Sequence, residues 1–247
     1  LPILRISGKC LLDLVLNFAY IFEVSEAETI AMGYTPENKD DFIETVQIEA
    51  PTQSAPIVCI MDSGVQEEHK YLAPSISSDE SISLLPNNTS TSDEVAGGGH
   101  GTRVAGAVLY PKAVPLDGVY QLPCWIRNMR ILDENNCLPE SVYPPKAIAI
   151  AVQKYNVENQ IPTKIFNHSI GSHRPCEMKH MTPWAAEIDS QSYNHDVLFI
   201  QAAGNISTDV ISAYWQAGYP YPEYLDRELC RISNPAQSLQ AITVGSV

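Results

Sequence analysis

Apolar runs rich in β-branched residues alternate along most of the chain with segments of helical periodicity. The pattern predicts helices over 100–110, 144–155 and 183–193, and strands over 57–61, 126–132, 164–169, 197–203 and 241–247. Helices that alternate with strands are typical of a parallel sheet covered on both faces. We therefore expect an α/β fold in three layers, with a mostly parallel sheet that is incomplete at the C-terminus.

The first fifty residues follow a different pattern. Ser7 is placed to cap a helix over Gly8 to Asn17, and an extended segment is expected from Phe18 to Val24. A polar, acidic stretch then leads to Thr52. We predict a small N-terminal element with a linker over residues 1–50, and a larger partial domain over residues 51–247.

Composition narrows the range of partners. A formal net charge of -14 would repel a phosphate backbone, so nucleic acid is not expected as a partner. No apolar run is long enough to cross a membrane.

The six cysteines include no CxxC pair, which leaves zinc-ribbon and thioredoxin-like sites without support. We expect mostly reduced cysteines and favour a cytoplasmic over a secreted protein.

Two motifs place an acidic and a basic side chain beside predicted elements of the fold. Asp62 directly follows the strand over 57–61, and catalytic groups of parallel sheets gather at the carboxyl ends of strands. Alone, such a residue is more typical of an ordinary turn at the end of a strand. His100 opens a predicted helix inside the glycine-rich segment from Gly97 to Gly106, where small residues allow close packing. This segment lacks the lysine of a phosphate-binding loop, so a nucleotide site is not expected.

Two further strand ends carry polar groups. Asn205 follows the strongly apolar strand over 197–203, and an asparagine amide at such a place can donate to a developing oxyanion. Ser169 and Gly171 lie where the strand over 164–169 ends, and their backbone could pair with an extended peptide. His168 lies in the same strand and is expected to be structural, because strand side chains alternate between two faces.

Together, three motifs resemble those of the subtilase family, the subtilisin-like serine proteases, and they occur in the family's chain order. They are Asp62-Ser63-Gly64, the segment from His100 to Gly106, and Ala203-Gly204-Asn205. The resemblance covers about residues 55 to 247 and implies a subtilisin-like fold and a serine endopeptidase.

The resemblance also implies roles. Asp62 would orient the imidazole, His100 would transfer the serine proton, and Asn205 would stabilise the oxyanion. Ser169 and Gly171 would bind the substrate, which would be a protein or peptide. The first thirty residues are similar to the end of a subtilase propeptide, although a plain extension fits equally well.

The family's nucleophile lies in a Gly-Thr-Ser-x-Ala-x-Pro motif, and this chain has none. Ser246 lies in the strand over 241–247, upstream of where that motif belongs, and is not expected to be catalytic. We therefore expect a chain that is truncated before its nucleophile and inactive by itself. The alternative is a non-catalytic relative that binds peptides.

A metal-dependent hydrolase is a third hypothesis, and it has little support because no HExxH motif or cluster of His and Asp occurs. The family resemblance would allow calcium, but the Asp and Glu residues show no recognisable spacing of a calcium loop. No cofactor and no metal ligand are predicted.

Overall fold

The main sheet has six strands in the order β3-β5-β2-β6-β7-β8, and every pair of neighbours in it is parallel. The structure is a computed structural model, and it describes residues 6–18, 21, 24, 46–97 and 99–245. The strands are β2 (Ile57–Asp62), β3 (Ile82–Ser83), β5 (Trp125–Arg130), β6 (Ile165–His168), β7 (Leu198–Ala202) and β8 (Ile242–Val244). Because parallel strands run in one direction, the carboxyl ends of β2, β6 and β7 share one edge of the sheet.

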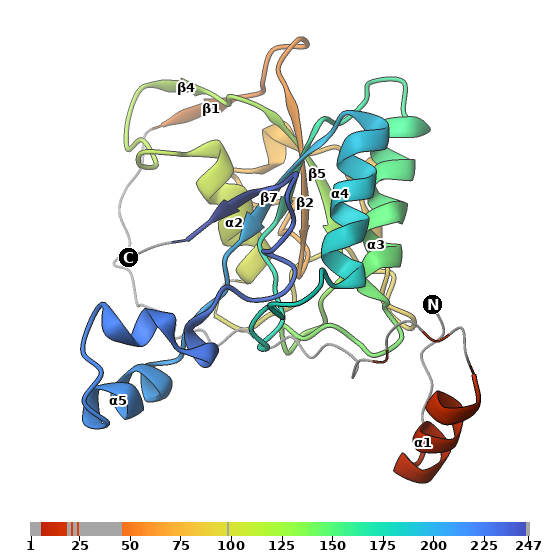
Figure 1. The fold of residues 1–247 in the computed structure, drawn as a ribbon. Helices are drawn as coiled ribbons and strands as arrows, with labels where there is room; N and C mark the ends of the chain where they lie inside the picture. Colours follow the sequence, from red (N-terminus) through yellow and green to blue (C-terminus); the bar gives the residue numbers. More distant parts are fainter. Residues whose placement is uncertain (1–5, 19–20, 22–23, 25–45, 98, 246–247) are drawn as a thin grey trace.

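Helices cover both faces of this sheet (Figure 1). They are α2 (His100–Leu109) on one face, and α3 (Pro144–Val152) and α4 (Pro183–His195) on the other. Val58 and Ile60 of β2 belong to the apolar cluster under α2. Cys59 and Met61 of the same strand belong to the cluster under α3 and α4. Both faces of β2 are thus buried, which explains its continuous apolar sequence.

These features confirm the predicted α/β fold, and most predicted strands and helices of the larger unit are present close to their expected bounds. The strand expected over 241–247 is observed as β8 over Ile242–Val244, and residues 246–247 lie outside the described residues. The helix expected over 144–155 differs in its last turn. Its α-helical part ends at Val152, and a π-helical turn follows over Gln153–Val157. The Tyr155 carbonyl there accepts hydrogen bonds from Arg127 Nη1 at 3.0 Å and Thr163 N at 2.8 Å, so it is committed to partners outside the helix.

The N-terminal helix α1 (Gly8–Asn17) forms as predicted, and Ser7 Oγ accepts a hydrogen bond from Cys10 N at 3.3 Å. None of its residues is buried. The extended segment predicted from Phe18 to Val24 and the linker that follows it lie largely outside the described residues. The division of the chain near residue 50 therefore stays a prediction.

Several short elements have no counterpart in the sequence prediction. β1 (Gln47–Glu49) and β4 (Val119–Gln121) form a separate parallel pair, and α5 (Thr208–Gln216) follows the turn after β7. α5 projects away from the sheet in Figure 1 and has no buried residue. Short 3-10 turns span Ala73–Ser75, Ser78–Glu80, Glu223–Asp226 and Glu228–Cys230.

The helices and the cysteines bear on two expectations from the sequence, which concern a membrane span and disulfide bonds. Within the described residues, no helix has both the length and the apolar character that crossing a bilayer requires. All six cysteines lie in the described part of the chain, and each is a free thiol.

Candidate active site

Asp62 and His100 come together at the carboxyl edge of the sheet. Asp62 ends β2 and is fully buried, whereas His100 begins α2 with 21% of its side chain exposed. His100 Nδ1 lies 2.6 Å from Asp62 Oδ1. Asp62 Oδ1 also accepts from Ser63 N at 2.7 Å, and Oδ2 has no hydrogen-bond partner among the described residues. A buried carboxylate with an unsatisfied oxygen attracts positive charge, so it favours a protonated imidazole.

Several charges act on the His100 imidazole. Burial disfavours its charged form, but the hydrogen bond to Asp62 and the negative charges of Asp62 and Asp93 outweigh burial and the positive charge of Arg103. The pKa of His100 is therefore raised above its ordinary value. An imidazole whose Nδ1–H is held by a carboxylate presents Nε2 as the atom that exchanges a proton with a reacting group.

The close approach of α2 to β2 depends on Gly101. A Cβ at this position would lie 2.2 Å from the Gly64 carbonyl oxygen and 3.0 Å from Asp62 Cβ. Gly101 N donates to Ser63 Oγ at 2.9 Å, so the helix begins directly against the residues that follow Asp62. Gly106 does not take part in this approach, because a Cβ there would meet nothing within 4 Å. The sequence prediction that the small residues of this segment pack closely is therefore wrong for Gly106.

Asn205 lies in an exposed turn beyond the end of β7, at the same edge of the sheet as Asp62. The start of this turn is well held, because Ala203 N donates to Val244 O at 2.8 Å and Ser233 N donates to Ala203 O at 2.8 Å. Within the described part of the chain, no hydrogen bond joins Asn205 to the Asp62–His100 pair.

Ser169 and Gly171 lie in the segment that leaves β6, and both are half-buried. Ser169 Oγ donates to Asn167 Oδ1 at 2.7 Å. Ser172 N donates to Asn234 O at 2.7 Å, which holds the segment beside the chain that follows α5. Because β6 lies between β2 and β7 in the sheet, this segment runs between Asp62 and Asn205 along the edge.

His168 lies in the interior, as the sequence predicts. Its Nδ1 is 2.6 Å from Gln201 Oε1, and its ring meets Trp184 edge to face. Gln201 Nε2 donates to Ile170 O at 2.8 Å and to Ala202 O at 3.0 Å, so Oε1 is left to accept from His168 Nδ1–H. Burial, partly offset by this hydrogen bond, lowers the pKa of His168 to about 4, so the ring is neutral at neutral pH.

Three buried polar residues near the site were not singled out from the sequence. Gln201 interrupts the strongly apolar strand β7, Arg130 ends β5 beside Asp62, and Asp93 precedes the glycine-rich segment. A polar side chain in an otherwise apolar strand is a signal that could have pointed to Gln201, because buried polar groups require partners. Arg130 does not stand out in this way, because β5 reads Trp-Ile-Arg-Asn-Met-Arg. Asp93 lies in a stretch that reads as a polar loop, where another acidic residue carries no such signal.

Comparison with known proteins identifies a family for most of the chain. The model of the family described as the subtilase family matches residues 53–247. No curated protein sequence shows a significant match to the chain.

Solved structures with a similar fold include three proteases. A lanthipeptide protease is 21% identical, with a TM-score of 0.51, and the match covers 77% of this chain and 48% of that protein. The psychrophilic subtilisin-like protease Apa1 from the Antarctic psychrotroph Pseudoalteromonas sp. AS-11 is 20% identical, with a TM-score of 0.50 and coverages of 78% and 36%. The S41 psychrophilic protease is 21% identical, with a TM-score of 0.50 and coverages of 82% and 55%. The chain thus spans about half the length of these proteins or less, and at such identities the likeness shows the fold.

Proposed function

The chain belongs to the subtilase family, and from that premise we propose that it supplies the aspartate, the histidine and the oxyanion donor of a serine endopeptidase. The observation that carries the proposal is the 2.6 Å contact between Asp62 Oδ1 and His100 Nδ1, at the carboxyl edge of a parallel sheet. Asp62 is fully buried, whereas His100 stays partly open to solvent. One ring nitrogen of the imidazole is therefore held by Asp62, while part of the ring can be reached from solvent.

The proposed proton transfer follows from this geometry. Asp62 accepts the Nδ1–H of His100, which fixes the tautomer and leaves the Nε2 lone pair for the proton of a serine hydroxyl. The serine oxygen then attacks the peptide carbonyl, and His100 returns the proton to the leaving amine. The buried negative charge of Asp62 stabilises the imidazolium that exists between these two steps, in accord with the raised pKa of His100.

The oxyanion and the substrate would be bound by the neighbouring strand ends. Asn205 is exposed, and in this proposal its side-chain amide donates to the oxygen that becomes negative during attack. Removal of one such donor typically lowers turnover by about 100- to 1000-fold. Ser169 and Gly171 lie between Asp62 and Asn205 along the edge, and they would pair through their backbone with an extended peptide.

The nucleophile is the missing component. The 247 residues contain no Gly-Thr-Ser-x-Ala-x-Pro motif, and we propose that the chain by itself does not form an acyl-enzyme. We propose no role for a metal, because the Asp and Glu residues show no recognisable spacing of a calcium loop.

A fluorophosphonate probe, which labels activated serines, tests this proposal. We expect no labelling of residues 1–247, and labelling of the polypeptide that the gene encodes when it is read past Val247. His100→Ala should remove that labelling. A labelled serine within residues 1–247 would contradict the proposal for the chain by itself, and undiminished labelling of His100→Ala would remove His100 from the mechanism.

A peptide-binding relative without catalysis is the second candidate, and the absence of the serine motif is what favours it. A stop codon after Val247, or a different residue in place of the downstream serine, would support this candidate. A downstream serine motif would support the endopeptidase.

A further inference from the structure

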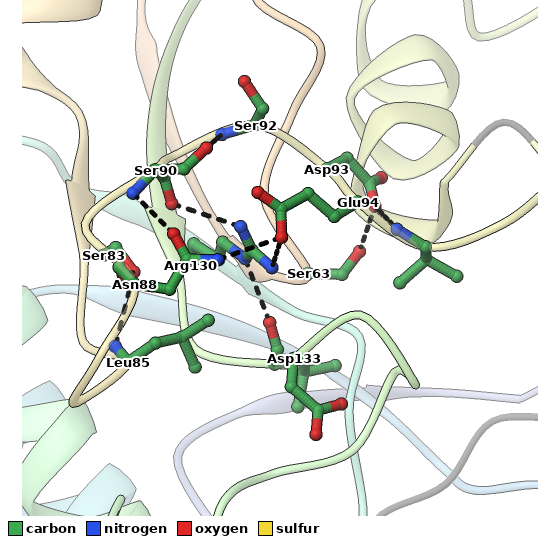
Figure 2. A network of polar contacts seen from close by, with 12 residues as sticks. Ser63, Ser83, Leu85, Asn88, Ser90, Ser92, Asp93, Glu94, Arg130 and Asp133 are labelled. Atoms are coloured by element: carbon green, nitrogen blue, oxygen red, sulfur yellow. Dashed lines mark hydrogen bonds and ion pairs between the residues drawn. The ribbon is translucent and has the colours of Figure 1, made fainter.

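Asp93 carries a second buried carboxylate near His100, with only 3% of the residue exposed. Its Oδ1 accepts from Ser63 Oγ at 3.0 Å and Val95 N at 3.2 Å. Its Oδ2 accepts from Thr102 N and from Thr102 Oγ1, both at 2.9 Å. Figure 2 shows the Asp93 side chain directed at Ser63. Four donors around one carboxylate make a site for a negative charge, not a chance burial of an acidic residue.

These bonds connect the neighbours of the two proposed catalytic residues. Ser63 directly follows Asp62, and its Oγ both donates to Asp93 and accepts from Gly101 N. Thr102 stands two positions after His100, in the first turn of α2. The first amide groups of a helix lack partners within the helix, and here Ser63 and Asp93 supply them. Asp93 therefore fixes the start of α2 against the end of β2.

The residue before the histidine fits the same arrangement. Gly99 has a φ of 75°, and a Cβ on it would lie 1.9 Å from Asp93 Oδ2. Only glycine tolerates both this backbone conformation and this close approach. The chain thus passes directly over the Asp93 carboxylate on its way to His100.

The loop that carries Asp93 is itself anchored to the sheet. Arg130 is fully buried, and its Nη2 donates to Glu94 Oε2 at 2.9 Å. The same guanidinium donates to Ser90 O at 3.3 Å (Figure 2). It also donates to Leu132 O at 3.2 Å. Arg130 is also the register partner of Asp62. The position of Asp93 is therefore set by the strand next to the one that carries Asp62.

We propose that Asp93 is a positioning residue for His100, which holds the first turn of α2 at a fixed place relative to Asp62 and adds a second negative charge to the surroundings of the imidazole. This inference rests on the proposed function, because it assigns His100 the role of the base. Asp93 acts through Ser63 and Thr102 and does not touch the reacting atoms.

The charges that face His100 agree with this role. They come from Asp62 of β2, from Asp93 of the preceding loop and from Arg103 of α2 itself. Both carboxylates act to raise the pKa of His100, and only burial and Arg103 oppose them. A neutral cap would hold α2 in the same way without adding charge beside the imidazole, so the pKa of His100 distinguishes the two cases.

The test is an NMR titration of the His100 ring protons in residues 1–247. Asp93→Asn keeps the size of the side chain and removes its charge, so the pKa of His100 should fall. Asp189→Asn is the matched control, because Asp189 accepts from Ser238 Oγ, Leu239 N and Gln240 N in another part of the fold. It should leave the pKa of His100 unchanged. An unchanged pKa in Asp93→Asn would overturn the proposal.

A second variant covers the case in which Asp93→Asn does not fold. Ser63→Ala removes the hydroxyl that joins Asp93 to Gly101, and it should both speed hydrogen exchange at the Gly101 and Thr102 amides and lower the pKa of His100. If Ser63→Ala left both the exchange rates and the pKa of His100 unchanged, the proposal would be overturned.

Neither the titration nor hydrogen exchange requires catalysis. A longer polypeptide without peptidase activity would therefore contradict the proposed function but not the role of Asp93.

Discussion

Asp62 and Arg130 are register partners at the ends of β2 and β5, and each holds a different part of the region around His100. Asp62 contacts the imidazole itself, with Oδ1 2.6 Å from Nδ1. Arg130 donates to Glu94 and thereby anchors the loop whose Asp93 binds the first turn of α2. Two adjacent strand ends thus fix the histidine, one by direct contact and the other through a loop.

Replacement of Asp62 by asparagine should lower the pKa of His100. The amide keeps the shape of the side chain but removes the charge and the carboxylate acceptor that favour the imidazolium. In an active longer polypeptide, turnover should fall by roughly 10,000-fold, because the wrong tautomer is then favoured. NMR titration of residues 1–247 checks the first effect. The exposed Asp79→Asn serves as control, and an equal pKa in both variants would contradict the assignment.

Two glycines of α2 should respond in opposite directions to alanine. Gly101→Ala places a methyl group 2.2 Å from the Gly64 carbonyl oxygen, so α2 must shift away from β2, at a cost of about 1–3 kcal/mol. Gly106→Ala meets nothing within 4 Å and should stabilise the helix by roughly 0.5–1 kcal/mol. Urea unfolding of both variants measures the difference. Equal stability of the two would show that the approach of α2 is not as close as described.

The contrast between these glycines shows how far the sequence could predict the site. The motif around His100 predicted a helix start packed closely on another element, and Gly101 fulfils that role. The sequence could not tell Gly101 from Gly106, because the face that a helix turns to the sheet depends on the exact angle at which it packs. Asp62 was predicted from its place at the end of a strand, because functional groups of a parallel sheet lie at the carboxyl ends of its strands.

The residues that support the site were harder to predict. Asp93 and Arg130 act through partners that are distant in sequence, such as Thr102 and Glu94. Hydrogen bonds between side chains of separate elements leave no periodic trace in the sequence. Short elements such as β1 and β4 also escaped, since a strand of three residues is too short to show alternation.

Gln201 is expected to hold the segment after β6 against β7. Gln201→Met keeps the volume but leaves Ile170 O, Ala202 O and His168 Nδ1–H without their partner. Each buried polar group left unsatisfied costs about 1–3 kcal/mol, so the melting temperature should fall by several degrees. Hydrogen exchange should also rise between Ser169 and Ser172.

The matched control is Gln191→Met on α4. Among the described residues, this glutamine bonds only to Glu187 on the same helix. Its stability should stay within about 0.5 kcal/mol of the parent chain. If Gln201→Met were as stable as this control, the buried glutamine would not hold the two strands together.

His168 should make the fold less stable in acid. Its pKa is lowered to about 4, so the folded state resists protonation that the unfolded chain accepts below a pH of about 6.5. Neutral His168 makes its full contribution to the free energy of unfolding above a pH of about 6.5, and this contribution is lost as the pH falls toward 4. His168→Asn removes the titrating group and should flatten the dependence of the unfolding free energy on pH between 6.5 and 4. Urea unfolding at several pH values, with His195→Asn as control, measures this. An equally steep dependence in His168→Asn would assign the acid sensitivity to other groups.

The role of His100 as the base is tested most directly by the rate at which the polypeptide read past Val247 hydrolyses casein, compared with its His100→Ala variant. His180→Ala is the control, because this exposed histidine pairs with Glu177 on the surface. If Asp62 and His100 form the base of a serine endopeptidase, His100→Ala should lose about 100- to 10,000-fold in turnover while His180→Ala keeps the parent rate. Equal hydrolysis by the parent and by His100→Ala would show that His100 is not the base.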